Sequence, residues 1–128
     1  MHKKILLVDD DPDDQLIFID TLQEIKSDVE CVTASNGVEA LEYLSTNDAA
    51  PSIIFLDLNM PLMNGFECLE RIKKNHQLKE IPVIIFTTSN SPLDQKRTRE
   101  LGAKTFINKT PDVAMLKTKL QDILTTRF

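Results

Sequence analysis

The sequence of 128 residues has little of several features that mark whole classes of protein. Its longest apolar runs are about four residues, far too short to cross a membrane. The start of the chain is basic, but the apolar run that follows it is too short for a signal peptide. Lysine and arginine form no block and the net charge is −5, which argues against a nucleic-acid-binding surface. We therefore expect no membrane or nucleic-acid partner and a cytoplasmic location.

Cysteine is also scarce. Cys31 and Cys68 lie in segments with an apolar pattern, which predicts small core residues with free thiols in a reducing cytosol rather than a disulfide. Hydrophobic residues make up 41% of the chain and charged residues 27%, as in a soluble globular protein. The length is that of one domain with a full core, so we expect residues 1–128 to form a single unit.

Strand and helix patterns alternate regularly along the chain. Continuous apolar runs, typical of strands covered on both faces of a parallel sheet, occur at Ile5–Val8, Ile53–Leu56 and Val83–Phe86. Two segments that mix polar and apolar residues predict edge strands, Val29–Thr33 and Lys104–Asn108. Helical spacing of apolar residues lies between and after the strands, at Phe18–Ile25, Val38–Leu44, Phe66–Ile72 and Val113–Ile123. The polar segment from Leu93 to Leu101 completes the series as a fourth helix in chain order.

Start and stop signals agree with these helices. A capping residue before a proline predicts helix starts at Asp11–Pro12, Ser91–Pro92 and Thr110–Pro111. Capping-box spacing predicts two more, at Asn36 with Glu39 and Asn64 with Glu67. Gly102 is expected to end the fourth helix. The result is a (βα)5 chain, and edge positions for the two weak strands predict a doubly wound, five-stranded parallel α/β sheet of flavodoxin-like order 2-1-3-4-5.

Polar residues follow the strands at the edge where such a sheet binds its ligand. They are Asp9 and Asp10 after the first strand, Asp57 after the third, Thr87 and Thr88 at the end of the fourth, and Lys109 after the fifth. Because the carboxyl ends of parallel strands share one edge, carboxylates, a hydroxyl and an ammonium are expected to meet there.

Acidic residues crowd the segment from Asp9 to Asp14. Asp11, Asp13 and Asp14 lie at the cap and first turn of a helix, where free N–H groups and the positive dipole end favour them. Asp9 and Asp10 precede the helix and have no such explanation. Together with Asp57 they would repel one another unless a cation were bound.

A hard divalent ion with oxygen ligands would relieve this repulsion. Mg²⁺ is favoured because it commonly binds through one or two carboxylates and keeps waters and phosphate oxygens, and Mn²⁺ is an alternative. A carboxylate beside such a metal can attack phosphorus, which makes Asp57 a candidate nucleophile. Thr87 and Lys109 could then bind phosphoryl oxygens, completing the parts of a phosphoryl-transfer site.

At this point the sequence resembles the receiver domain of bacterial two-component response regulators, the family of the single-domain chemotaxis regulator. The resemblance covers essentially the whole chain. It rests on the motifs ILLVDDDP (5–12), NGVEAL (36–41), IIFLDLNMPLMNGFECL (53–69), IPVIIFTT (81–88) and LGAKTFINK (101–109).

The resemblance implies a role for each matched residue. Asp57 is similar to the phosphoacceptor, which takes a phosphoryl group from a histidine kinase or a phosphotransfer protein. The implied metal ligands are Asp10, Asp57 and the backbone carbonyl of Asn59, with Asp9 holding metal-bound water. The implied switch and phosphate-binding residues are Thr87, Thr88, Phe106 and Lys109.

The sequence departs from the family pattern at two positions. Thr88 stands where alanine is more common, which would narrow access to the phosphoryl site. Thr110 stands where the family usually has proline directly after the lysine, often in a cis bond. A cis Lys109–Thr110 bond would cost a few kcal/mol more than a cis prolyl bond. We also expect no output domain, since the chain ends one helix after the last strand.

Three functions are compatible with this sequence. The first is a phosphorylation switch that works by binding a downstream protein, as a monomer or as a weak dimer through the fourth helix, fifth strand and fifth helix. The second is a phosphohydrolase, which usually needs a second acid where this chain has Asn59. The third is a flavin-binding electron carrier, whose phosphate-binding loop would occupy the acidic segment after the first strand. The first is favoured, so we expect no turnover enzyme.

Overall fold

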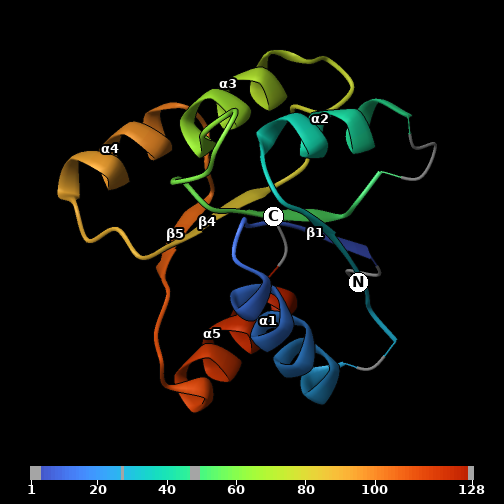
Figure 1. Cartoon of the computed structure of the whole chain (residues 1–128), viewed down its shortest axis with the longest axis vertical. Helices are drawn as coiled ribbons and strands as arrows, with labels where there is room; N and C mark the ends of the chain where they lie inside the picture. Colours follow the sequence, from blue (N-terminus) through green and yellow to red (C-terminus); the bar gives the residue numbers. More distant parts are fainter. Residues whose placement is uncertain (1–3, 27, 47–49, 127–128) are drawn as a thin grey trace.

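The computed structural model describes residues 4–26, 28–46 and 50–126, which form one five-stranded sheet with helices on both faces (Figure 1). The strands are β1 (Lys4–Val8), β2 (Glu30–Ala34), β3 (Ile53–Leu56), β4 (Val83–Thr87) and β5 (Thr105–Asn108). The helices are α1 (Pro12–Ile25), α2 (Gly37–Thr46), α3 (Gly65–Lys74), α4 (Pro92–Glu100) and α5 (Val113–Thr125). All strand pairs are parallel and the order is β2-β1-β3-β4-β5, which confirms the predicted fold.

The two faces of the sheet carry separate cores. Helices α1 and α5 cover one face, and α2, α3 and α4 cover the other (Figure 1). Along β1, Leu6 and Val8 pack into the core beneath α2 and α3, whereas Ile5 and Leu7 pack into the core beneath α1 and α5. Both faces of the central strands are therefore buried, which is why their sequences are continuously apolar.

Most of the predicted helix boundaries are confirmed. Asp11 caps α1, Asn64 caps α3 and Ser91 caps α4. The Asn36 Oδ1 atom accepts the Glu39 N–H at the start of α2. Gly102 follows α4 with a φ of 109°, a left-handed conformation that suits glycine.

The predicted start of the last helix is wrong. Helix α5 does not begin at Pro111 behind a Thr110 cap. It begins at Val113 behind Asp112, whose Oδ1 atom accepts the N–H groups of Ala114 and Met115. A carboxylate that accepts two free N–H groups is a better cap than a threonine hydroxyl, and Thr110 instead accepts the Asp112 N–H.

Both cysteine thiols are free, and the predicted core position is confirmed for Cys68, whereas Cys31 on the edge strand β2 is only partly buried. Among the helices described, none combines the length and the apolar character needed to span a bilayer.

Candidate functional site at the carboxyl edge of the sheet

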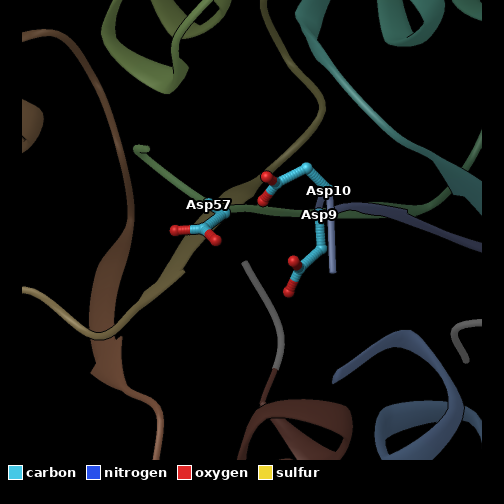
Figure 2. Close-up of side chains that lie close together, drawn as sticks. All are labelled: Asp9, Asp10 and Asp57. Atoms are coloured by element: carbon cyan, nitrogen blue, oxygen red, sulfur yellow. The ribbon is translucent and has the colours of Figure 1, made fainter. Parts of the chain in front are cut away.

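Three carboxylates meet where β1 and β3 end (Figure 2). Val8 pairs with Leu56 in the sheet, so the next residues, Asp9 and Asp57, leave it at the same level. The Asp57 N–H donates to the Val8 carbonyl at 2.9 Å, which ties the two strand ends together. Carboxylate oxygens of Asp9, Asp10 and Asp57 all lie within 4.8 Å of one another. The cluster predicted from the sequence is therefore present.

Lys109 reaches this cluster from the end of β5. Its Nζ atom lies 2.7 Å from Asp9 Oδ2 and 2.9 Å from Asp57 Oδ2. Its backbone N–H donates to the Thr87 carbonyl at 2.7 Å, which fixes the loop from which the side chain extends. Burial lowers the pKa of Lys109, but its hydrogen bonds with carboxylates outweigh burial and raise that pKa above its usual value. The ammonium is therefore a permanent positive charge in the site.

Asp9 and Asp57 differ in their surroundings although both are buried. Burial raises the pKa of Asp9 above its usual value, and the nearby Lys109 ammonium and the hydrogen bond from the Asp11 N–H oppose this effect. Asp57 is held from both sides, because its Oδ1 atom accepts the Leu58 N–H at 2.7 Å while Oδ2 faces Lys109. Asp10 is exposed, so the cluster is open to solvent on the side of this residue.

The backbone after Asp57 turns sharply beside the cluster. A Cβ atom on Gly65 would lie 2.1 Å from the Asp57 carbonyl oxygen, so only glycine fits there. Leu62 in the same loop has a φ of 65°, in the left-handed region. Asn59, whose carbonyl was expected to bind metal, is exposed in this loop.

The residues expected to respond to phosphorylation lie at the ends of β4 and in β5. Thr87 is fully buried and Thr88 is exposed. Phe106 is half-buried against the core beneath α2 and α3, and it lines a cavity of about 280 Å³ between α4 and β5. The part of the chain described contains no cis peptide bond, so Lys109–Thr110 is trans.

One contact in the site was not anticipated. The sequence pattern predicts Asp14 only as an acid in the first turn of α1, but in the structure its Oδ2 atom lies 2.9 Å from Lys109 Nζ. The sequence does contain a clue to this contact, because α1 begins soon after Asp9 and Asp10 and its first turn must therefore lie near the cluster.

The donor set fits a divalent metal ion. Oxygen atoms of three carboxylates within 4.8 Å form a hard, negatively charged group, which is the type of ligand that Mg²⁺ and Mn²⁺ prefer. The single ammonium of Lys109 leaves excess negative charge among them, and Asp10 leaves an exposed side from which an ion can enter.

Comparison with known proteins decides the family. The model of the response regulator receiver domain matches residues 5–121. The chain belongs to this family. Receiver domains are phosphorylation-dependent switches of two-component signalling: histidine kinases phosphorylate them, they bind divalent metal, and they bind downstream targets.

Similar proteins include response regulators and chemotaxis proteins. Response regulator Rcp1 of Synechocystis is 33% identical over 126 residues, which are 94% of this chain and 86% of Rcp1. Chemotaxis protein CheY1 of Helicobacter pylori is 32% identical over 123 residues, with 96% and 98% of the two chains covered.

Solved structures agree with this placement. The phosphorylated cyanobacterial phytochrome response regulator RcpA has a TM-score of 0.90 and 33% identity, covering 100% of this receiver domain and 98% of RcpA. The Mn²⁺-bound form of Rcp1 has a TM-score of 0.87 and 32% identity, covering 98% and 97% of the two chains.

Proposed function

We propose that this receiver domain accepts a phosphoryl group on Asp57 from a histidine kinase or a phosphotransfer protein. The observation that carries the proposal is the position of the Asp57 carboxylate. It is buried at the end of a central strand, 2.9 Å from the permanent charge of Lys109 and beside the carboxylates of Asp9 and Asp10. Asp9 is also buried, and its oxygens face the Asp11 N–H and Lys109. Of these two buried carboxylates, however, only Asp57 accepts a hydrogen bond from Lys109.

The chemistry is a single displacement at phosphorus. An oxygen of Asp57 forms a bond to phosphorus as the phosphorus–nitrogen bond of a phosphohistidine breaks, and the electron pair leaves with the imidazole nitrogen. The product is a mixed anhydride. Lys109 neutralises one phosphoryl oxygen, and the Thr87 hydroxyl donates to another.

Asp10, Asp57 and the Asn59 carbonyl are the residues that would hold Mg²⁺, or Mn²⁺ in its place, and Asp9 would hold water bound to the ion. When bound, the ion neutralises charge on the phosphoryl oxygens. The existence of an Mn²⁺-bound form of Rcp1, a similar protein, supports the binding of a divalent ion by this receiver domain.

Asn59 makes this protein a switch rather than a turnover enzyme. It stands two residues after Asp57 and has no acidic or basic group, so it can position a water molecule but cannot deprotonate it. We expect the phosphoryl group to persist for seconds to hours, far longer than an intermediate of a dedicated hydrolase.

The output is binding of a downstream protein. Movement of the Thr87 hydroxyl toward the phosphoryl group makes room for the Phe106 ring to turn inward, and the α4, β5 and α5 surface changes with it. We propose that residues 1–128 act as one receiver domain, a monomer or a weak dimer through this surface. The free thiols of Cys31 and Cys68 favour a reducing cytoplasm as its location.

Intact mass spectrometry tests this function. After incubation with acetyl phosphate and Mg²⁺, the wild-type protein should gain one phosphoryl group that is lost in alkali. Asp57→Asn should gain none. Asp28→Asn, which removes an exposed acid just before β2 at the opposite edge of the sheet, should gain as much as wild type. A phosphoryl group on Asp57→Asn, or none on the wild-type protein, contradicts the proposal.

A further inference from the structure

Lys109 is shared by more carboxylates than phosphate binding on Asp57 requires. Asp9 and Asp57 contact its ammonium from the ends of β1 and β3, at 2.7 and 2.9 Å. Asp14 contacts the same nitrogen at 2.9 Å from the first turn of α1. This third contact joins residues 95 positions apart in the sequence, and it has no part in the function proposed above.

The crowding of carboxylates around the Lys109 ammonium means that this contact affects phosphoryl binding. An ammonium has three N–H donors, and three carboxylate oxygens lie within 2.9 Å of Nζ. Nζ donates hydrogen bonds to Asp14 and Asp57, and its approach to Asp9 is an ion pair without a hydrogen bond. A phosphoryl oxygen on Asp57 must therefore share a positive charge that three carboxylates already face. The phosphoryl group and Asp14 compete for one cation.

Burial decides which carboxylate releases the lysine at least cost. The side chains of Asp9 and Asp57 are 0% and 8% exposed, whereas that of Asp14 is 33% exposed. Without Lys109, the Asp9 and Asp57 oxygens would lose their partner away from water, which is costly. Water can replace the lysine at Asp14, so this contact is the exchangeable one.

Resting on the proposed function, we infer that Asp14 is a positioning residue that competes with the phosphoryl group for Lys109. Its carboxylate stabilises the unphosphorylated state by holding part of the lysine charge on the α1 side. The same carboxylate adds negative charge beside the incoming phosphoryl group. Both effects make binding of a phosphoryl group at Asp57 less favourable, so Asp14 weakens that binding.

Titration with beryllofluoride in the presence of Mg²⁺, followed by calorimetry, tests this role on the full chain. Beryllofluoride is a tetrahedral anion that mimics a phosphoryl group on a carboxylate. Asp14→Asn, which removes the charge and keeps the size, should bind it about two- to fivefold more tightly, the range for one partly exposed ion pair. Asp14→Glu, which restores the charge, should return the affinity to within about twofold of wild type.

Asp13→Asn is the matched control. Asp13 lies in the same first turn of α1 and carries the same charge, but it is exposed and makes no contact with Lys109 in the part of the chain described. Its replacement should leave the beryllofluoride affinity at the wild-type value. In a Lys109→Gln background, Asp14→Asn should no longer increase the affinity, because the two residues act through one contact.

The failures are distinguishable. If the wild-type protein does not bind beryllofluoride, the proposed function is overturned and this inference with it. If wild type binds and Asp14→Asn binds equally or more weakly, only the inference is overturned. The same holds if Asp13→Asn increases the affinity as much as Asp14→Asn, because the effect would then be one of general charge.

Discussion

Gly65 is the residue on which the shape of the site depends most directly. A Cβ atom there would lie 2.1 Å from the Asp57 carbonyl oxygen and 2.7 Å from the Leu58 Cα atom, both of them backbone. Gly65→Ala should therefore lower the free energy of unfolding by about 3 kcal/mol or more, since backbone must move. Urea unfolding measures this loss.

Gly37 provides the control for Gly65. The three atoms nearest to a Cβ on Gly37 all belong to the Met63 side chain, at 2.8 to 2.9 Å, and none is backbone, so the contact can be relieved with less movement than at Gly65. Gly37→Ala should cost within about 1 kcal/mol. Equal losses for the two variants would show that the close approach to Asp57 does not constrain the loop.

Cys68 gives a pH dependence whose sign follows from burial. Its side chain is fully buried, and burial raises its thiol pKa from 9.0 to about 12, with a small opposing effect from Arg71. Above the pKa of 9.0 the unfolded chain releases a proton that the folded protein retains. The thiol therefore contributes stability that is present below that pKa and is lost as the pH rises toward about 12.

Urea unfolding between about pH 8 and about pH 11 tests this pH dependence. Wild type should lose more stability over the range than Cys68→Ala, which lacks the thiol although it is less stable at every pH. Identical pH slopes for the two proteins would contradict the raised pKa.

At the scale of the elements, the loop between β4 and α4 links Thr87 to the helix. The Ser89 N–H donates to Thr87 Oγ1 at 3.4 Å, and the Ser89 hydroxyl donates to Asp94 Oδ2, in the first turn of α4, at 2.6 Å. The Asn108 side-chain amide donates to the Ser89 carbonyl. Ser89 thus connects β4, α4 and β5, and we expect a movement of Thr87 to reach α4 and β5 through it.

Ser89→Ala should separate phosphorylation from its effect on α4. The variant should still gain a phosphoryl group, because Ser89 makes no contact with Asp57. The phosphorylation-dependent change in amide hydrogen exchange over residues 92–100 should fall to less than about half. Ser45→Ala, which removes an exposed hydroxyl at the end of α2, should retain the full change. An undiminished change in Ser89→Ala would exclude the loop as the connection.

The elements also show how far the sequence predicts this structure. The sequence indicates the strand order. Burial on two faces requires apolar residues throughout, so the continuous apolar runs mark β1, β3 and β4 as central strands and the mixed patterns mark β2 and β5 as edge strands. Asp9, Asp10 and Asp57 follow from that order. The contact between Asp14 and Lys109 does not, since it depends on side-chain directions between residues 95 positions apart. The predicted start of α5 is wrong because the sequence offers two capping residues there, Thr110 and Asp112, and the pattern does not decide between them.

At the scale of the whole molecule, crowded charge at one edge of the sheet opposes folding. Asp10 adds an exposed carboxylate to a cluster already holding Asp9 and Asp57. Asp10→Ala should raise the metal-free stability by a few tenths to about 1 kcal/mol, because repulsion is relieved. It should also abolish the further stabilisation that Mg²⁺ gives to the wild-type protein. Thermal unfolding with and without Mg²⁺ checks both effects, and unchanged stabilisation by Mg²⁺ would remove Asp10 from the metal ligands.

The identity of the phosphorylated residue tests the central claim most directly, because four aspartates surround Lys109 or adjoin the cluster. Borohydride reduces an acyl phosphate to an alcohol and leaves free carboxylates intact, so the reduced peptide records where the phosphoryl group was. After phosphorylation, reduction and peptide mass spectrometry, the alcohol should appear at position 57 alone. An alcohol at Asp9, Asp10 or Asp14, with Asp57 unmodified, would contradict the account.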